Sequence, residues 1–140
     1  MKILLAFLFS IIVQVAFSQE CFLVVSTGGG ITGAATVYQI RPDGKVLKGN
    51  GLGQINYSEE SRIKRSVARK YYRKTRKLVD TSPEFNHPGN IYYSIAANEN
   101  GKEMKMSWGD SEHQAPEQAK DLYAEINKTL SELSFTTTTH

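Results

Sequence analysis

Histidine, cysteine and carboxylate side chains are the residues here that could hold a metal ion or act as acid and base. The three histidines, His87, His113 and His140, are scattered, and no His-x-x-x-His or Cys-x-x-Cys pair is present. No nucleophile motif or spaced serine, histidine and aspartate set accompanies them. We therefore expect no metal, no cofactor and no catalysis. A small hydrolase would become a candidate only if His87 lay beside His113 and an acid.

A glycine-rich run has the spacing of a phosphate-binding loop. It fits G-x-G-x-x-G, the dinucleotide-binding fingerprint, and comprises Gly28, Gly29, Gly30, Ile31, Thr32 and Gly33. That fingerprint needs a helix directly after the glycines to hold the pyrophosphate. Residues 34–41 read as a strand instead, so nucleotide binding is not expected. The run is either a structural turn or bulge or a loop that contacts a partner.

Basic residues are concentrated in one segment. Nine of the 17 lie in residues 62–77, which contain none of the 14 acidic residues. On a helix, with 100° per residue, seven of them share one face. We term this set the anionic-partner face: Arg62, Arg65, Arg69, Arg73, Arg76 and Lys77, with Lys70 beside them. It is either a solvated surface or a docking site for anionic lipid, acidic glycan or an acidic protein. Nucleic acid is not expected, because no strand with interleaved aromatic and basic residues accompanies it.

The first 18 residues indicate export. Lys2 precedes an apolar run over residues 3–17, which is followed by the small-x-small pattern of a signal peptide cleavage site. The run is shorter than the roughly 20 residues that span a bilayer. We expect cleavage near Ser18 and Gln19, and a secreted or periplasmic protein that does not span a membrane. The only cysteine, Cys21, cannot form an internal disulfide, so stability must come from packing.

Residues 19–134 are expected to form a single α+β domain, followed by a flexible tail over residues 135–140. Two amphipathic helices are predicted, one with Ser58 as its N-cap and one after Pro116. The predicted strands and helices cover residues 21–26, 34–41, 45–48, 59–78, 91–97, 102–108 and 117–133. The simplest arrangement is an antiparallel sheet of four to five strands with both helices on one face, in the order β-ββ-α-ββ-α.

Several residues of this layout occur in the same order in a known family. They are the turn Gly29-Gly30-Ile31-Thr32-Gly33, the strand tyrosines Tyr92 and Tyr93, and Pro116 before the last helix. The layout resembles that of emfourin, a small bacterial inhibitor of thermolysin-like metalloproteases. The resemblance implies an α+β fold and a protease-binding function. The long basic helix has no counterpart in that layout.

We therefore predict an exported, non-catalytic binding module, with a protein (protease) inhibitor as the favoured kind. Its partner would contact turns at one end of the sheet, at residues 28–33, 85–90 and 98–101. The alternative is an envelope-associated protein that docks its basic helix on anionic lipid or glycan. Ionic strength separates the two hypotheses, because salt screens the attraction between charged surfaces and affects an inserted loop much less.

Overall fold

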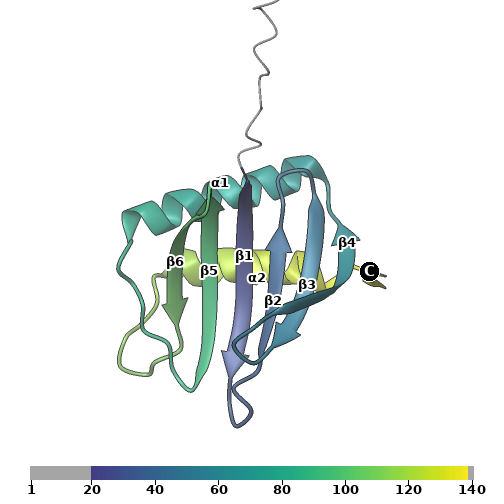
Figure 1. Ribbon diagram of the computed structural model, residues 1–140. Coiled ribbons are helices and arrows are strands. Elements are labelled where there is room, and N and C mark those ends of the chain that lie inside the picture. The colour runs from purple at the N-terminus through teal and green to yellow at the C-terminus, as the bar shows by residue number, and fades with distance from the viewer. Residues whose placement is uncertain (1–19, 139–140) are drawn as a thin grey trace, which may run out of the picture.

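The protein is described by a computed structural model that covers residues 20–138. The predicted signal peptide lies outside these residues. The described chain is an α+β domain with one antiparallel sheet and two helices (Figure 1). Its elements are β1 Cys21–Gly29, β2 Ala35–Ile40, β3 Lys45–Gly51, β4 Asn56–Arg62, α1 Arg65–Thr81, β5 Ile91–Glu99, β6 Lys102–Trp108, α2 Glu117–Ser131 and β7 Thr136–Thr137. No helix in this part of the chain is long and apolar enough to cross a bilayer.

The sheet has seven strands in the order β6-β5-β1-β2-β3-β4-β7. β1 is central, because it pairs with β2 on one side and with β5 on the other. Strand side chains alternate between the two faces of a sheet. Leu23 and Val25 of β1 therefore face one side and are buried, whereas Phe22 and Val24 face the other side and are only half-buried.

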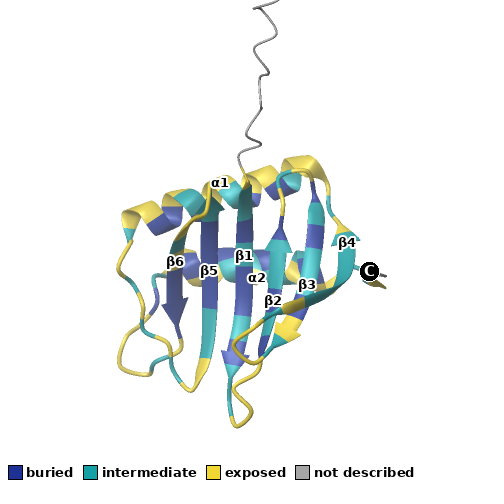
Figure 2. Ribbon diagram, in the orientation of Figure 1, coloured by how far each residue is buried: buried dark blue, intermediate teal, exposed yellow. Residues whose placement is uncertain are grey.

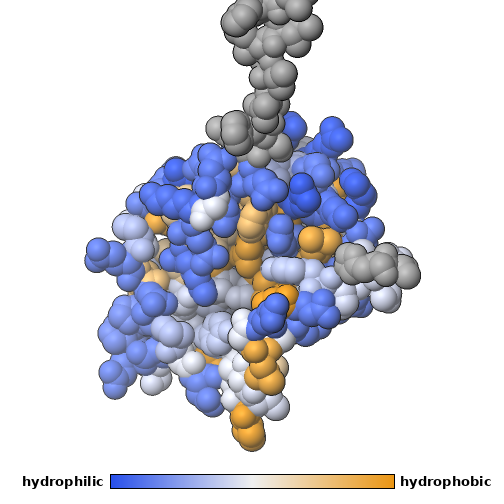
Figure 3. Space-filling view, in the orientation of Figure 1, coloured by the Kyte–Doolittle hydropathy of each residue, from blue (hydrophilic) through white to orange (hydrophobic). Residues whose placement is uncertain are grey.

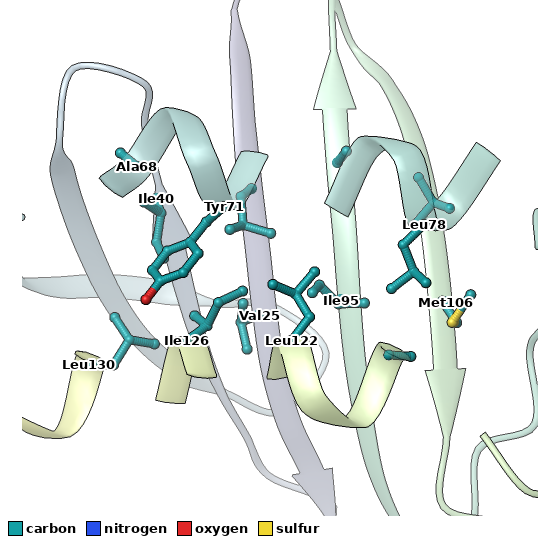
Figure 4. Close-up of a cluster of buried hydrophobic side chains, with 14 of the residues drawn as sticks. Val25, Ile40, Ala68, Tyr71, Leu78, Ile95, Met106, Leu122, Ile126 and Leu130 are labelled. Atoms are coloured by element: carbon teal, nitrogen blue, oxygen red, sulfur yellow. The ribbon is translucent and has the colours of Figure 1, made fainter. Parts of the chain in front are cut away.

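Both helices cover the same face of the sheet, and the core lies between the two layers (Figure 4). Ile95 and Met106 on the sheet are fully buried there together with Ile126 of α2. The last helix is amphipathic, as its spacing of apolar residues at three and four predicts, and four of the six residues of that stripe are buried: Ala119, Leu122, Ile126 and Leu130. Tyr123 is only half-buried, and α2 ends at Ser131, before the sixth residue, Leu133. The buried stripe of α2 is therefore used to form the core of the protein.

The first helix begins later than the sequence predicted. Residues 56–62 form strand β4, and α1 starts at Arg65. Glu59 and Glu60 looked suited to a first helical turn, but their carboxylates bind Lys48 and Lys45 on β3, at 2.8 and 3.0 Å. Cross-strand pairs of opposite charge stabilise a sheet. The prediction of four to five strands was therefore too low.

Part of the segment predicted to be a flexible tail is ordered. The Phe135 ring lies 5.9 Å from the Tyr38 ring, and the Lys48 ammonium lies 5.4 Å from the Phe135 ring centre. This aromatic anchor precedes β7, which pairs with β4. The Thr138 N–H then donates a hydrogen bond of 2.8 Å to the Ser58 carbonyl. Residues 139–140 lie outside the described part of the chain.

The two ends of the sheet differ in character. At the end that we term the turn end, the Gly30 N–H donates a 2.7 Å hydrogen bond to the Asn90 carbonyl, which joins the β1–β2 turn to the loop before β5. At the opposite end, termed the helix end, α1 crosses the sheet (Figure 1). The predicted contact turn at residues 98–101 lies at the helix end, where the Asn100 N–H donates to the Glu20 carbonyl. Only two of the three predicted turns, residues 28–33 and 85–90, therefore lie together.

Candidate functional site

The glycine run ends β1 and turns the chain into β2. Gly28 and Gly29 are strand residues that pair with Tyr92 and Ile91 of β5. Gly29 has φ +98°, and a Cβ there would collide with the Asn90 carbonyl oxygen, so only glycine fits this position without strain. The turn leads into a strand, as expected, and no helix N-terminus is available for a pyrophosphate.

Apolar side chains are exposed at the turn end. Within residues 20–138, three large hydrophobic residues are exposed: Ile31 at 107%, Leu52 at 69% and Ile91 at 54%. They come from the β1–β2 turn, the β3–β4 turn and the start of β5, and Leu52 lies beside Gly33. Figure 3 shows hydrophobic side chains at the lower tip of the molecule, whereas the rim of the upper half is mostly hydrophilic. These exposed apolar residues make the turn end a candidate interaction surface.

The sheet face opposite the helices carries a groove of about 480 Å³. Small buried residues, Ser26 and Ser94, form part of its floor, and their hydroxyls hydrogen-bond each other. The hairpin of β3 and β4 forms a wall with Ile55 and Tyr57. Burial raises the pKa of Tyr57, and the Glu103 carboxylate raises it further. The lining of the groove combines apolar side chains, such as Val24 and Val37, with the charged Glu103 and Lys105.

Two other cavities involve the helices. One, of about 390 Å³, lies at the helix end beside Arg41, Arg65 and Arg69. The second, of about 510 Å³, lies between α1 and α2 beside Leu78 and Leu122. Neither holds a histidine.

The structure divides the basic segment into paired and unpaired cations. Lys70 and Lys74 bind the two carboxylate oxygens of Glu125 on α2, at 2.7 and 2.9 Å. Arg76, predicted to belong to the anionic-partner face, binds Asp80 and Glu99 within the protein instead. The outer side of α1 is exposed (Figure 2). Six cations of residues 62–77 have no acid within 4.0 Å among residues 20–138: Arg62, Lys64, Arg65, Arg69, Arg73 and Lys77.

The Glu125 bridge between the helices predicts a pH dependence of stability. The hydrogen bond from Lys70, and then that from Lys74, lowers the pKa of Glu125. Because the folded pKa lies below the unfolded value of about 4.3, ionised Glu125 stabilises the fold above that pH, and the contribution is lost as pH falls through the folded pKa. We expect Glu125→Gln to lower the free energy of unfolding at neutral pH by less than about 1 kcal/mol, because the pair is largely exposed.

Urea unfolding of wild type and Glu125→Gln at neutral and strongly acidic pH measures this effect. The difference between the two proteins should vanish in acid. Glu132→Gln on the exposed end of α2 is the matched control and should change stability at neither pH. A deficit of Glu125→Gln that persists in acid would contradict the ionic origin of the stabilisation.

Two of the three histidines meet at the turn end, against expectation. The His87 and His113 rings are stacked, with centroids 3.8 Å apart and planes at 7°. Phe85 packs edge-to-face with His87, with ring centroids 4.9 Å apart. One ring nitrogen of each histidine and one Asp110 carboxylate oxygen lie within 4.8 Å of one another. We term these three residues the His–Asp cluster.

Backbone hydrogen bonds hold the His–Asp cluster together. The His87 N–H donates to the Ser107 carbonyl at 3.0 Å, and the Asp110 N–H donates to the His87 carbonyl at 3.1 Å. One Asp110 oxygen accepts a 2.8 Å hydrogen bond from the Glu112 N–H, and the other lies 2.8 Å from His113 Nδ1. The Glu112 N–H, followed by His113, lowers the pKa of Asp110. Asp110 is therefore an ionised carboxylate held in a fixed position.

The chain matches no family model, and no curated protein matches it.

Proposed function

We propose that the protein is an exported, non-catalytic binding module that contacts a partner protein with its turn end. The observation that carries this proposal is the gathering of Ile31, Leu52 and Ile91, the exposed large hydrophobic residues of the described chain, at one end of the sheet. Burial of such a side chain against a partner contributes about 1.5–3 kcal/mol. Three of them on neighbouring turns are enough to anchor an interface.

The rigidity of the turn favours an inserted contact. Gly30 is bonded to Asn90 through its N–H, and the Gly33 N–H bonds back to the Gly30 carbonyl at 3.2 Å. A loop that is ordered before binding loses little entropy when it binds. Together with the resemblance to emfourin, this supports an inhibitor whose β1–β2 turn enters the cleft of a thermolysin-like metalloprotease.

His87 lies beside His113 and an acid, which is the arrangement that would make a hydrolase a candidate. The three cavities described above nevertheless provide no concave substrate site around these side chains. Catalysis on a small substrate needs a concave site that surrounds the reacting groups. Neither His87 nor His113 lines any of the three cavities described above. We therefore retain a binding function.

Inhibition of a purified thermolysin-like protease tests the proposal. The mature protein should inhibit it, and Ile31→Ser should weaken inhibition by about 10–100-fold, which corresponds to the loss of one buried apolar side chain. Thr32→Ser is the matched control, since it changes the neighbouring exposed residue and removes only a methyl group. Inhibition should persist as ionic strength rises. Absence of inhibition, or equal inhibition by wild type and Ile31→Ser, would count against an inserted turn.

A second candidate function rests on the six unpaired cations near and on α1. They lie on the helix end and would dock the protein on an anionic lipid surface. Binding to vesicles that contain anionic lipid should then weaken steeply with salt, and the triple reversal of Arg65, Arg69 and Arg73 to glutamate should abolish it. Lys70→Glu and Lys74→Glu are less useful as tests of vesicle binding, because both lysines already bind Glu125 within the protein. Unchanged vesicle binding by the triple variant would exclude this function.

A further inference from the structure

We propose that His87, Asp110 and His113 form a binding site for one divalent transition-metal ion, with Zn²⁺ as the best match. Two imidazoles and one carboxylate are a donor set that Zn²⁺ accepts, whereas Ca²⁺ and Mg²⁺ require oxygen ligands. The proposal does not rest on the proposed contact with a partner protein, although the site lies at the same turn end.

The separation of the donor atoms suits a single ion. Bonds of about 2.0–2.2 Å place the ligand atoms of a tetrahedral zinc site about 3.4 Å apart. The three donor atoms of the cluster already lie within 4.8 Å of one another. Bringing the donor atoms to that separation requires a closure of about 1 Å. The stacked rings are nearly parallel and hold the nitrogen lone pairs of His87 and His113 in separate planes, so the exposed His113 must also rotate out of the stack.

The surroundings of the cluster hold two of the donors in place. His87 is fixed by Phe85 on one side of its ring and by the backbone bond to Ser107. Asp110 is fixed by the Glu112 N–H, and its negative charge offsets part of the charge of the ion. Only His113 has to move, so little order has to be gained when the metal binds.

The site would join two loops that are distant in sequence. His87 lies in the loop before β5, and Asp110 and His113 lie in the segment after β6. A bound ion would clamp these segments at the open end of the β5–β6 hairpin. Three protein ligands leave the fourth position of a tetrahedral ion for water or for a donor atom from another molecule.

Calorimetric titration of the purified protein with Zn²⁺ tests the proposal. We expect one saturable site per chain. His87→Ala and His113→Gln should each weaken binding by at least about tenfold, and Asp110→Asn by about 10–100-fold. His140→Ala is the matched control, because it removes the remaining histidine of the chain and should leave the affinity unchanged. Ca²⁺ should not bind.

Thermal unfolding in a chelator separates loss of the site from loss of the fold. His113 is exposed, so we expect the His113→Gln variant to have the same unfolding temperature as wild type in the chelator. This variant decides the test if His87→Ala does not fold. The visible spectrum of the Co²⁺-loaded protein should show tetrahedral coordination and should change in Asp110→Asn. The proposal is overturned if Zn²⁺ does not saturate a single site, if His113→Gln binds like wild type, or if His140→Ala loses binding.

Discussion

Replacing Gly29 by alanine should lower the free energy of unfolding by about 3 kcal/mol. Two effects add at this position. The backbone has φ +98°, a conformation that residues with a side chain adopt only at a cost in conformational energy. The new Cβ would also collide with the backbone carbonyl of Asn90. The Asn90 carbonyl cannot move aside as the end of a flexible side chain can, because Asn90 directly precedes β5 and its carbonyl accepts the Gly30 N–H. The strain should therefore spread into the adjacent β1–β5 pairing.

Gly30→Ala provides the matched comparison. Gly30 also has a positive φ, of +75°, but no atom lies within 4 Å of the place where its Cβ would stand. We expect a loss of only about 1 kcal/mol. Urea denaturation of both variants measures the two losses. Equal losses would show that the collision with Asn90 contributes nothing, and that the backbone angle alone explains the need for glycine.

Replacing Ile95 by alanine should destabilise the protein by about 3–5 kcal/mol, because it removes buried atoms and leaves a cavity. Ile95 is fully buried and stands between Val25 and Met106, its partners across the neighbouring strands. Both helices pack over this part of the sheet (Figure 4), so the surroundings have little freedom to collapse into the space.

Ile91→Ala is the same substitution on the same strand and serves as the control. Ile91 is 54% exposed, so its truncation should change stability by no more than about 0.5 kcal/mol. Thermal or urea unfolding compares the two variants. A loss at Ile91 as large as that at Ile95 would mean that Ile91 is covered in solution, and the turn end would lose one of its three apolar contacts.

The elements whose apolar residues recur at a regular spacing, or whose turn residues are distinctive, were predicted well from the sequence. The stripe of α2 and the hairpin that turns at Asn100 and Gly101 needed no information beyond local pattern and turn chemistry. Strand β4 was missed because Ser58 and two glutamates also suit the start of a helix. The strand forms by backbone pairing with β3, where two lysines meet the two glutamates, and that information is not local. The ordered tail was missed for the same reason, since Phe135 is held by Tyr38.

The two halves of the candidate site were predicted with different success. The glycine turn was found because four glycines in six residues disfavour regular structure and permit the positive φ angles of a turn. The His–Asp cluster was missed because spacing rules describe ligands on one element, whereas His87 and His113 lie on either side of a hairpin. A hairpin returns its two outer ends to the same place. The prediction of strands over residues 91–108 therefore already implied that residues just before and just after them are neighbours.

The turn end and the helix end point in opposite directions, so a molecule engaged at one of them leaves the other accessible. A copy that rests on a charged envelope surface through α1 would hold Ile31 and Leu52 outward, about one strand length away, where a soluble enzyme could reach them. The two proposed contacts are thus sterically compatible, and a single chain could act as a tether that recruits a protein to that surface.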